Sequence, residues 1–527
     1  MAAAAAPAAP RGRVAVRRAW LEPALVAAAI AAVYLVWAPP SADLAAQEFR
    51  TWLFDAEGLG VWNGQWFAGH HTPGYSLLFP PLAALLGPRL AGSLAVVAAA
   101  AAFGALAGRA WGTQARVGSL WFGAAATTCL FTGRLTFALG VAVGLGALLA
   151  LQRGRRGLGL GLAAATALAS PVAALFLGLA GIAWALAGRR RLGAALAVAA
   201  VAPAAFLSVA FPEGGTEPFV TSAFLPVAIV IVAALLALPA DERLLRIGAA
   251  LYGLAALAAF VLDTPMGGNV TRLETLFAGP LLACALWGRR TAVLLCLAPV
   301  LLYFQWGPPV RDVRRADGDP TVARAYYRPL LRFFAAQPGP FRAEVTPTLD
   351  HWESRWVAPH VPLARGWVRQ LDRKYGPLFY DGTLAPATYR AWLDELGVRY
   401  VAVPDGPLDY AAAGEARLVR SGRVPGLRPA ARAGHWRVWS VAGARLAAGP
   451  AAVTALGPGE VRLAVRRPGA VLVKVRFSPY WAITQGRGCV EDAGGFTRVR
   501  ATAAGPLRLA IRFSPERIVA RGPRCTD

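Results

Sequence analysis

The sequence predicts an α-helical polytopic membrane domain followed by a mixed α/β unit and a β-sandwich. Hydrophobic residues make up 56% of the 527 positions and the mean hydropathy is +0.47, which is high for a water-soluble protein. The apolar residues are concentrated in residues 20–306, in runs of the kind that cross membranes. Residues 307–527 are instead rich in Arg and Pro, and apolar and polar residues alternate near their end, as in antiparallel strands.

The membrane domain is predicted to begin after a cytoplasmic basic leader, residues 1–19. The first apolar run, 20–37, lacks a small-residue cleavage site and is followed by more apolar runs, so we interpret it as a retained signal anchor. Further runs occupy 90–107, 115–132, 136–151, 157–169, 171–187, 194–211, 219–238, 245–262, 273–287 and 290–306. Together these runs predict about eleven spans.

Arginine placement predicts the orientation of this domain. If the N-terminus is cytoplasmic and the spans alternate, the cytoplasmic segments hold sixteen arginines. The external segments before the tail hold four: Arg50, Arg89, Arg134 and Arg272. Because positive residues concentrate in cytoplasmic loops, this bias supports the orientation. An odd number of spans then places the loop 38–89 and the C-terminal region outside, and we expect Leu77–Leu86 to be an interfacial helix.

The net charge of +25 does not indicate a nucleic-acid partner. Nearly all of the basic residues are arginines, and many lie in the short connections between apolar runs, where they mark the cytoplasmic side. The others are dispersed without a basic run of the kind that nucleic-acid arms carry. A membrane partner therefore explains the charge better than a nucleic acid does.

The loop 38–89 carries the first candidate site residues. Acids, adjacent histidines and aromatics meet there at the membrane surface: Asp43, Glu48, Trp66, His70, His71 and Tyr75. A carboxylate in such a loop can serve as a general base. The aromatics suit either stacking on a substrate or an interfacial belt. For His70 and His71 we favour hydrogen bonding or substrate positioning over metal binding, because no third ligand follows at a suitable spacing.

External turns between later spans carry further charges. Arg134 and Arg272 lie in Gly-containing turns, and Glu274 follows closely after Arg272. Charge at membrane depth is costly unless it is paired or lines a wet cavity. Two guanidinium groups on one face can bind a lipid phosphate bidentately, and Glu274 is a candidate substrate-positioning residue. The alternative is that these are ordinary loop charges reaching the headgroups.

This arrangement resembles the GT-C superfamily of integral-membrane glycosyltransferases, with a general likeness to actinobacterial membrane proteins. The resemblance rests on Asp43 soon after the first span, the long first loop, the aromatic-His-Pro stretch 62–81, the short span before Ser170 and Pro171, and the external tail. It implies a multi-pass protein of the bacterial plasma membrane that uses a polyprenyl-phosphate sugar at the outer face. It also implies an envelope glycan or glycolipid as acceptor.

The resemblance assigns the base to the first-loop carboxylate Asp43, with Glu48 next. Arg134 and Arg272 would then stabilise the leaving lipid phosphate. The tandem acidic pair of the superfamily is absent, because Leu44 follows Asp43. This departure leaves the exact base open and a divalent metal possible.

The C-terminal region is predicted to divide at about residue 437. In 307–436, segments 321–336 and 386–396 look helical and 398–404 reads as a buried strand. Between them, 348–382 mixes aromatic with polar residues, which suits either carbohydrate binding or a loop-rich core. In 437–527, HWRVWSV and the alternating segments after it predict an antiparallel β-sandwich.

Cysteine placement predicts one disulfide. Cys489 and Cys525 are the only cysteines in the C-terminal region, which the predicted topology places in an oxidising compartment. We expect them to pair and to hold the C-terminus.

Two other functions remain open. A transporter or lipid-linked-sugar flippase would use the spans themselves, but charges within the spans are almost absent and no convincing inverted repeat is visible. A non-catalytic protein of envelope assembly is the other alternative.

Overall fold

The computed structural model describes residues 19–520 and divides the chain into two compact units. The first, which we call the helical unit, comprises Met1–Pro39, Arg89–Ala204 and Pro218–Arg311. The second, the tail unit, comprises Pro40–Pro88, Ala205–Glu217 and Asp312–Asp527. The first loop was predicted to belong to the membrane domain, yet most of it groups with the C-terminal region. The predicted boundary at residue 306 falls inside a helix, Thr291–Ala316.

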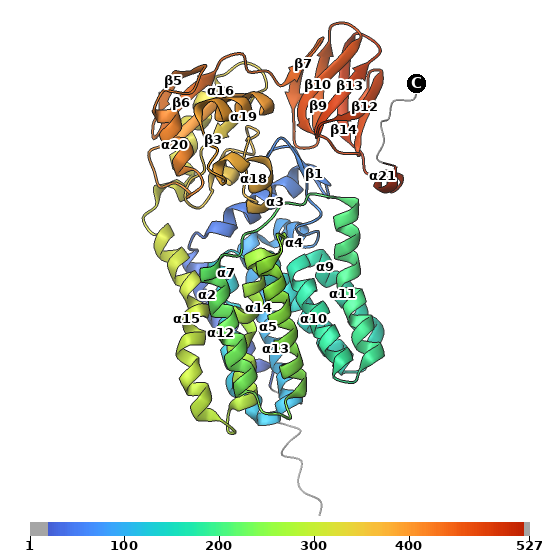
Figure 1. The fold of residues 1–527 in the computed structure, drawn as a ribbon, viewed down its shortest axis with the longest axis vertical. Helices are drawn as coiled ribbons and strands as arrows, with labels where there is room; N and C mark the ends of the chain where they lie inside the picture. The colour runs from blue at the N-terminus through green and yellow to red at the C-terminus, as the bar shows by residue number, and fades with distance from the viewer. Residues whose placement is uncertain (1–18, 521–527) are drawn as a thin grey trace, which may run out of the picture. The chain divides into compact units, whose positions relative to one another are not determined.

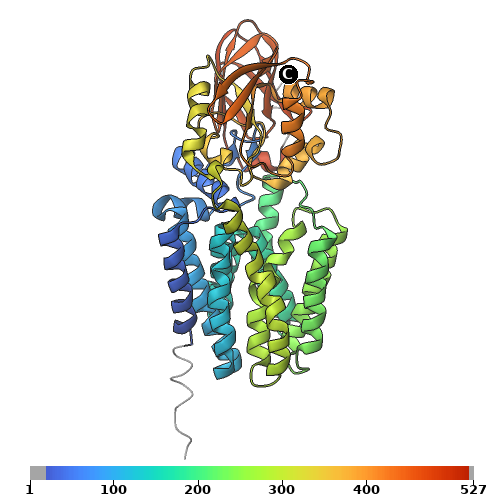
Figure 2. The ribbon, with the colours of Figure 1, turned by 90° about the vertical axis from the view of Figure 1, so that its left-hand side faces the viewer.

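Every apolar run predicted from the sequence is helical, and the run 115–132 is divided into two helices at Thr127. These are α2 (Leu21–Trp37), α5 (Pro88–Trp111), α6 (Ala115–Ala126), α7 (Thr128–Phe131), α8 (Leu135–Gln152), α9 (Arg156–Ala169), α10 (Pro171–Leu186), α11 (Arg190–Ala210), α12 (Thr221–Ala237), α13 (Arg243–Val261), α14 (Thr271–Leu286) and α15 (Thr291–Ala316). Figures 1 and 2 show α12, α13 and α14 lying side by side within the helical unit. The helical fold class is therefore confirmed.

The protein is a multi-pass membrane protein. Among the described residues, five helical segments are long and apolar enough to cross a membrane, or six if α2 and the helix after it count as one span. Three more apolar helices, α9, α10 and α12, are 14 to 17 residues long. The total of eleven spans stays a prediction. Helix α2 ends at Ala38, whose left-handed φ of 49° is followed by two prolines that cannot continue the helix.

Small residues let the membrane helices approach closely. A Cβ atom added at Gly118 of α6 would lie 2.4 Å from the carbonyl oxygen of Pro280 on α14, and one at Gly140 of α8 would lie 2.7 Å from Ser170. Neither separation can hold a real side chain, so glycine permits these contacts. Close packing of small residues is the usual basis of helix association in membranes.

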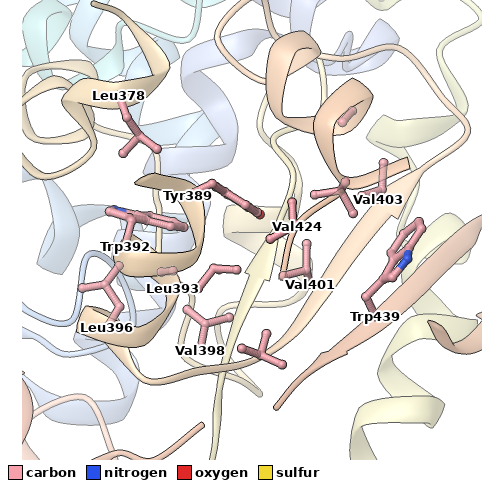
Figure 3. Close-up of a cluster of buried hydrophobic side chains, with 14 of the residues drawn as sticks. Leu378, Tyr389, Trp392, Leu393, Leu396, Val398, Val401, Val403, Val424 and Trp439 are labelled. Carbon is pink, nitrogen blue, oxygen red and sulfur yellow. The ribbon is translucent and has the colours of Figure 1, made fainter. Parts of the chain in front are cut away.

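The tail unit contains a four-stranded mixed sheet in the order β3-β4-β6-β5. Its strands are β3 (Arg342–Val345), β4 (Val398–Pro404), β5 (Leu427–Ala433) and β6 (Trp436–Val441). The helices of this part are α16 (Arg324–Ala335), α17 (Glu353–Trp356), α18 (Arg369–Tyr375), α19 (Pro386–Leu396) and α20 (Ala413–Arg420). Figure 3 shows Tyr389, Trp392 and Leu393 of α19 in one cluster with Val401 and Val403 of β4. The mixed α/β prediction is confirmed.

Two antiparallel four-stranded sheets form the predicted sandwich. One has the order β12-β13-β10-β7 and the other β11-β14-β9-β8. Their strands are β7 (Ala447–Ala448), β8 (Ala451–Leu456), β9 (Glu460–Val465), β10 (Gly469–Arg476), β11 (Trp481–Gln485), β12 (Gly488–Ala493), β13 (Phe496–Ala501) and β14 (Gly505–Ile511). Alternate residues of both sheets share one buried core, such as Val471 and Val473 with Leu507 and Leu509.

The strand HWRVWSV does not open the sandwich as predicted. It forms β6, which pairs antiparallel with β4 and so belongs to the mixed sheet. The alternation in its sequence shows that it is a strand, but not which strand it pairs with. The sandwich begins about ten residues later, at β7.

Within the tail unit, the first loop packs against the C-terminal region. It contains α3 (Ala42–Glu57), β1 (Trp62–Asn63), β2 (His70–His71) and α4 (Phe79–Leu86). Trp62 belongs to the sandwich core and meets Trp481 with ring centroids 5.8 Å apart. The amide of Gly64 donates to the carbonyl of Pro458 at 2.7 Å, and that of Arg476 donates to Ala68 at 2.8 Å.

Candidate functional site

The polar face of α3 holds the predicted base. Asp43, Gln47 and Arg50 follow at spacings of four and three residues, which places them on one side of the helix. The opposite side is buried through Leu44, Phe49 and other apolar residues. Asp43 lies in the first turn, where the helix dipole favours a carboxylate. Asp43 is half-buried.

Tyr75 joins this face from the end of the same loop. The Gln47 amide donates to the Tyr75 hydroxyl at 2.8 Å, and the Arg50 guanidinium carbon lies 3.5 Å from the centre of the Tyr75 ring. Burial lowers the pKa of Arg50, while Tyr75 and Asp43 oppose that shift. Sequence analysis did not single out Arg50 as a site residue. Its offset of seven residues from Asp43 is the signal that could have found it.

Trp66 packs against α3, and His70 packs against Trp66. Trp66 is fully buried and stacks on Phe49 with ring centroids 4.1 Å apart, and the His70 ring is parallel to Trp66 at 6.0 Å. Burial lowers the pKa of His70 to about 4, so its ring is neutral at neutral pH. Trp66 therefore packs within the unit, and a direct role for either residue in positioning substrate stays a prediction.

A strained turn leads into His70. Phe67 and Ala68 have φ values of 59° and 63°, in the left-handed region that side chains disfavour. Gly69 follows with a φ of 122°, and a Cβ atom there would lie 2.1 Å from the Trp62 ring. Trp62 lies in the sandwich core on one side of this turn, and His70 packs against Trp66 on the other. Glycine is required at position 69 because any side chain there would collide with Trp62.

His71 has a different environment from His70. Its Nδ1 lies 2.7 Å from Oε1 of Glu213, and its Nε2 lies 3.0 Å from the Ser478 hydroxyl. The His71 amide also donates to Glu213, and Tyr375 donates to the other Glu213 oxygen at 3.3 Å. These partners belong to the tail unit and come from three separate parts of the sequence. His71 thus links the loop to them, which the sequence alone did not reveal.

Glu48 is engaged in an ion pair. Its Oε2 lies 3.2 Å from Nε of Arg355, and both side chains are about a quarter exposed. Because Glu48 is five residues after Asp43, it points to a different side of α3. The structure therefore places the two candidate bases in distinct settings, with Glu48 held by a cation.

Arg134 and Arg272 line a single pocket in the helical unit. Arg134 lies just before α8 and Arg272 in the first turn of α14, so two helix N-termini, which favour anions, reach this place. The pocket also contains threonines and Gln305, whose amide donates to the Thr275 carbonyl at 2.7 Å. Its volume is about 20 Å³, which suits one water-sized group.

Glu274 does not line this pocket. It follows Arg272 by two residues on α14, which turns the two side chains to opposite sides of the helix. Its side chain is buried in the helical unit, with 6% of the residue exposed. Its predicted substrate-positioning role stays a prediction.

The region 348–382 mainly forms a buried network of charges. Arg365 pairs with Asp372 at 2.5 Å and with Glu415 at 3.1 Å, and all three side chains are nearly inaccessible. The His351 ring lies between Glu353 and Asp409, at 3.3 and 3.4 Å. The predicted alternative of a loop-rich core thus describes these residues better than an open carbohydrate site does.

The remaining predictions concern metal and cysteines. Among residues 19–520, no group of three or more His, Cys, Asp or Glu side chains is arranged to hold a metal ion. A divalent metal stays unassigned. Cys489 lies on β12, whereas Cys525 lies outside the described residues, so the disulfide also stays a prediction.

No protein-family model matches the chain, and no curated protein matches it. Similar solved structures include the following two. One is the arabinofuranosyltransferase AftD from mycobacteria, with 16% identity and a TM-score of 0.46 over 95% of this chain and 60% of that one. The other is ArnT from Cupriavidus metallidurans bound to undecaprenyl phosphate, with 16% identity and a TM-score of 0.45 over 84% of this chain and 100% of that one.

The chain therefore spans about 60% of the length of the arabinofuranosyltransferase. Both TM-scores lie below 0.5, so neither likeness assigns a role to any residue. The function proposed below rests on the residues of the chain itself.

Proposed function

We propose that the protein is a membrane glycosyltransferase of the GT-C type. It moves a sugar from a polyprenyl-phosphate donor to an envelope glycan or glycolipid. The observation that carries the proposal is the pocket shared by Arg134 and Arg272, which come from two helices of a multi-pass membrane protein. Paired guanidinium groups next to two helix N-termini suit the phosphate of a membrane lipid.

The proposed reaction uses one base and one anion site. The acceptor hydroxyl oxygen attacks the anomeric carbon of the donor sugar, and the bond from that carbon to the phosphate oxygen breaks. The lipid phosphate leaves with the bonding electrons, and its negative charge is stabilised by Arg134 and Arg272. Asp43 accepts the proton of the acceptor hydroxyl. Arg50 and Gln47 lie on the same side of α3 as Asp43, and both contact Tyr75.

We propose that the N-terminus is cytoplasmic and that the C-terminal region is external. The support is the strong bias of arginines toward the segments that this orientation makes cytoplasmic. Polyprenyl-phosphate sugars and envelope glycans would then meet at the outer face of the membrane. The N-terminal helix α2 would serve as the signal anchor.

The proposal is tested by incubating the purified full-length protein with radiolabelled polyprenyl-phosphate sugars and envelope glycans or glycolipids. We expect label to move from the lipid to one acceptor. If no donor and acceptor pair gives transfer, while the reconstituted protein moves the intact lipid-linked sugar across vesicles, the protein is a flippase instead. Failure of both assays would favour a non-catalytic role in envelope assembly.

A further inference from the structure

A basic groove of about 830 Å³ lies in the tail unit beside α16. Its lining comes from α16, from the segment after it and from residues 360–362, with a contribution from Leu456. None of its lining residues belongs to the α3 face or to the pocket of Arg134 and Arg272. We propose that this groove binds an acidic glycan, a linear sugar chain that carries carboxylates or phosphates.

Three arginines form one wall of the groove. Arg324, Arg328 and Arg332 are spaced four residues apart on α16, and all are exposed. This spacing places them on one side of the helix with a rise of about 6 Å per step. The other side of α16 packs into the tail unit through buried residues: Tyr326, Tyr327, Leu330 and Phe334. The helix therefore presents a regular row of cations to the groove.

This row is unfavourable for the helix by itself. Like charges four residues apart repel, and a cation at Arg324, the first residue of α16, opposes the helix dipole. Helix α16 contains no acidic residue, and among residues 19–520 no ion pair is formed by Arg324, Arg328 or Arg332. Among the same described residues, no Asp or Glu lines the groove. A bound polyanion would relieve this repulsion at each step of the row.

His360, which is not part of α16, also lines the groove. Partial burial lowers the pKa of His360, and Arg324 and Arg355 lower it further. The imidazole is thus neutral at neutral pH and can accept or donate a hydrogen bond. It adds a polar group without adding an acid that would repel an anionic ligand.

The floor of the groove favours a glycan over a nucleic acid. Phe334 and Phe341 line it, but they are only 2% and 7% exposed. Base stacking requires open aromatic faces, which these buried rings do not offer. The apolar C–H groups of sugar rings can instead contact the partly exposed aliphatic residues of the lining, Leu331, Pro340 and Leu456, while their acidic groups reach the arginine row. If the protein is a glycosyltransferase as proposed above, this glycan is its acceptor.

The test measures binding of short oligogalacturonate, an acidic glycan, to the purified full-length protein. The control ligand is the same oligosaccharide with its carboxylates methyl-esterified. We expect the acidic form to bind and the neutral form not to bind. Affinity should fall as salt is raised, because exposed charge contacts are screened. Replacing the row with alanine (R324A, R328A, R332A) should weaken binding roughly tenfold, since each exposed charge pair contributes modestly.

A matched triple variant carries the control. R466A, R467A and R487A remove the same charge from exposed positions of the sandwich that do not line the groove, and should leave the affinity unchanged. The proposal is overturned if both triple variants lose equally, if the esterified ligand binds as well, or if a single-stranded oligonucleotide of equal charge competes fully. Unfolding temperatures of both variants check that they are folded.

Sugar transfer separates this proposal from the proposed function. Transfer to a short neutral acceptor is measured on the unaltered protein, because no residue that lines the groove is among those assigned to the reaction. A protein that binds oligogalacturonate through the arginine row but transfers no sugar contradicts the proposed function alone. A protein that transfers sugar but does not bind this ligand contradicts the groove alone.

Discussion

Arg134 and Arg272 are far apart in the sequence, yet both line one small pocket. Arg134 immediately precedes α8 and Arg272 is in the first turn of α14, so both residues lie at helix N-termini. Sequence reasoning found this pair because charge beside an apolar run is costly and therefore conspicuous. At the scale of single residues, this is where the sequence was most informative.

The arginine pair leads to a prediction about donor binding. Arg134→Ala and Arg272→Ala should each weaken binding of polyprenyl phosphate by about tenfold to a hundredfold, since a charge-assisted contact contributes roughly 1.5–3 kcal/mol. Lysine at either position should recover only part of the loss, because it lacks the planar fork of arginine. Competition with a labelled polyprenyl phosphate measures the effect. Equal loss of donor and acceptor binding would argue against the phosphate role.

His70 leads to a prediction about pH. Its pKa is about 4 in the folded chain and 6.5 in the unfolded chain, so the unfolded chain binds more protons between these values. Stability from this residue is therefore present above pH 6.5 and is lost as the pH falls toward 4. The loss at pH 5 should be about 2 kcal/mol. His70→Gln should reduce the drop in unfolding temperature between pH 7 and pH 5, and an unaltered drop would contradict this account.

At the scale of elements, local patterns predicted more than pairings. The apolar runs and the alternating segments each formed the expected helix or strand, because those periodicities reflect which side of an element is buried. The partner of β6 was mistaken because HWRVWSV would alternate in either sheet. Likewise, nothing near Trp62 in the sequence shows that it meets Trp481 in the sandwich core.

Burial of Trp62 predicts that the loop stabilises the sandwich. Trp62→Ala should create a cavity in the sandwich core and cost on the order of 3–5 kcal/mol. We expect a lower unfolding temperature and faster proteolysis within β7–β14. Leu59→Ala is the matched control, because Leu59 lies in the same loop and is 69% exposed. If the two variants are equally stable, the loop does not contribute to that core.

At the scale of the whole molecule, the fold class was predictable but the grouping of segments was not. Length and hydropathy separated the membrane helices from the C-terminal region. The contacts nevertheless group residues 40–88 and 205–217 with that region. The loop joins through Trp62 and the His71–Glu213 pair, which are contacts between distant parts of the chain. Such contacts leave no periodic signal in the sequence.

The first loop has two roles in the proposed mechanism. Its α3 carries Asp43, the proposed base, and its β1 and β2 are fastened within the tail unit. A base needs a steady position relative to its substrate, and burial of one side of α3 provides that locally. The role of Asp43 is therefore the claim on which the proposed mechanism most depends.

The most direct test measures donor binding and sugar transfer by Asp43→Asn in parallel with the unaltered protein. The change keeps the shape of the side chain but removes its ability to accept a proton. We predict unchanged binding of the polyprenyl-phosphate sugar, an unchanged unfolding temperature, and transfer slowed by about 10²–10⁴-fold. Transfer at a rate near that of the unaltered protein would show that Asp43 is not the base, and attention would move to Glu48.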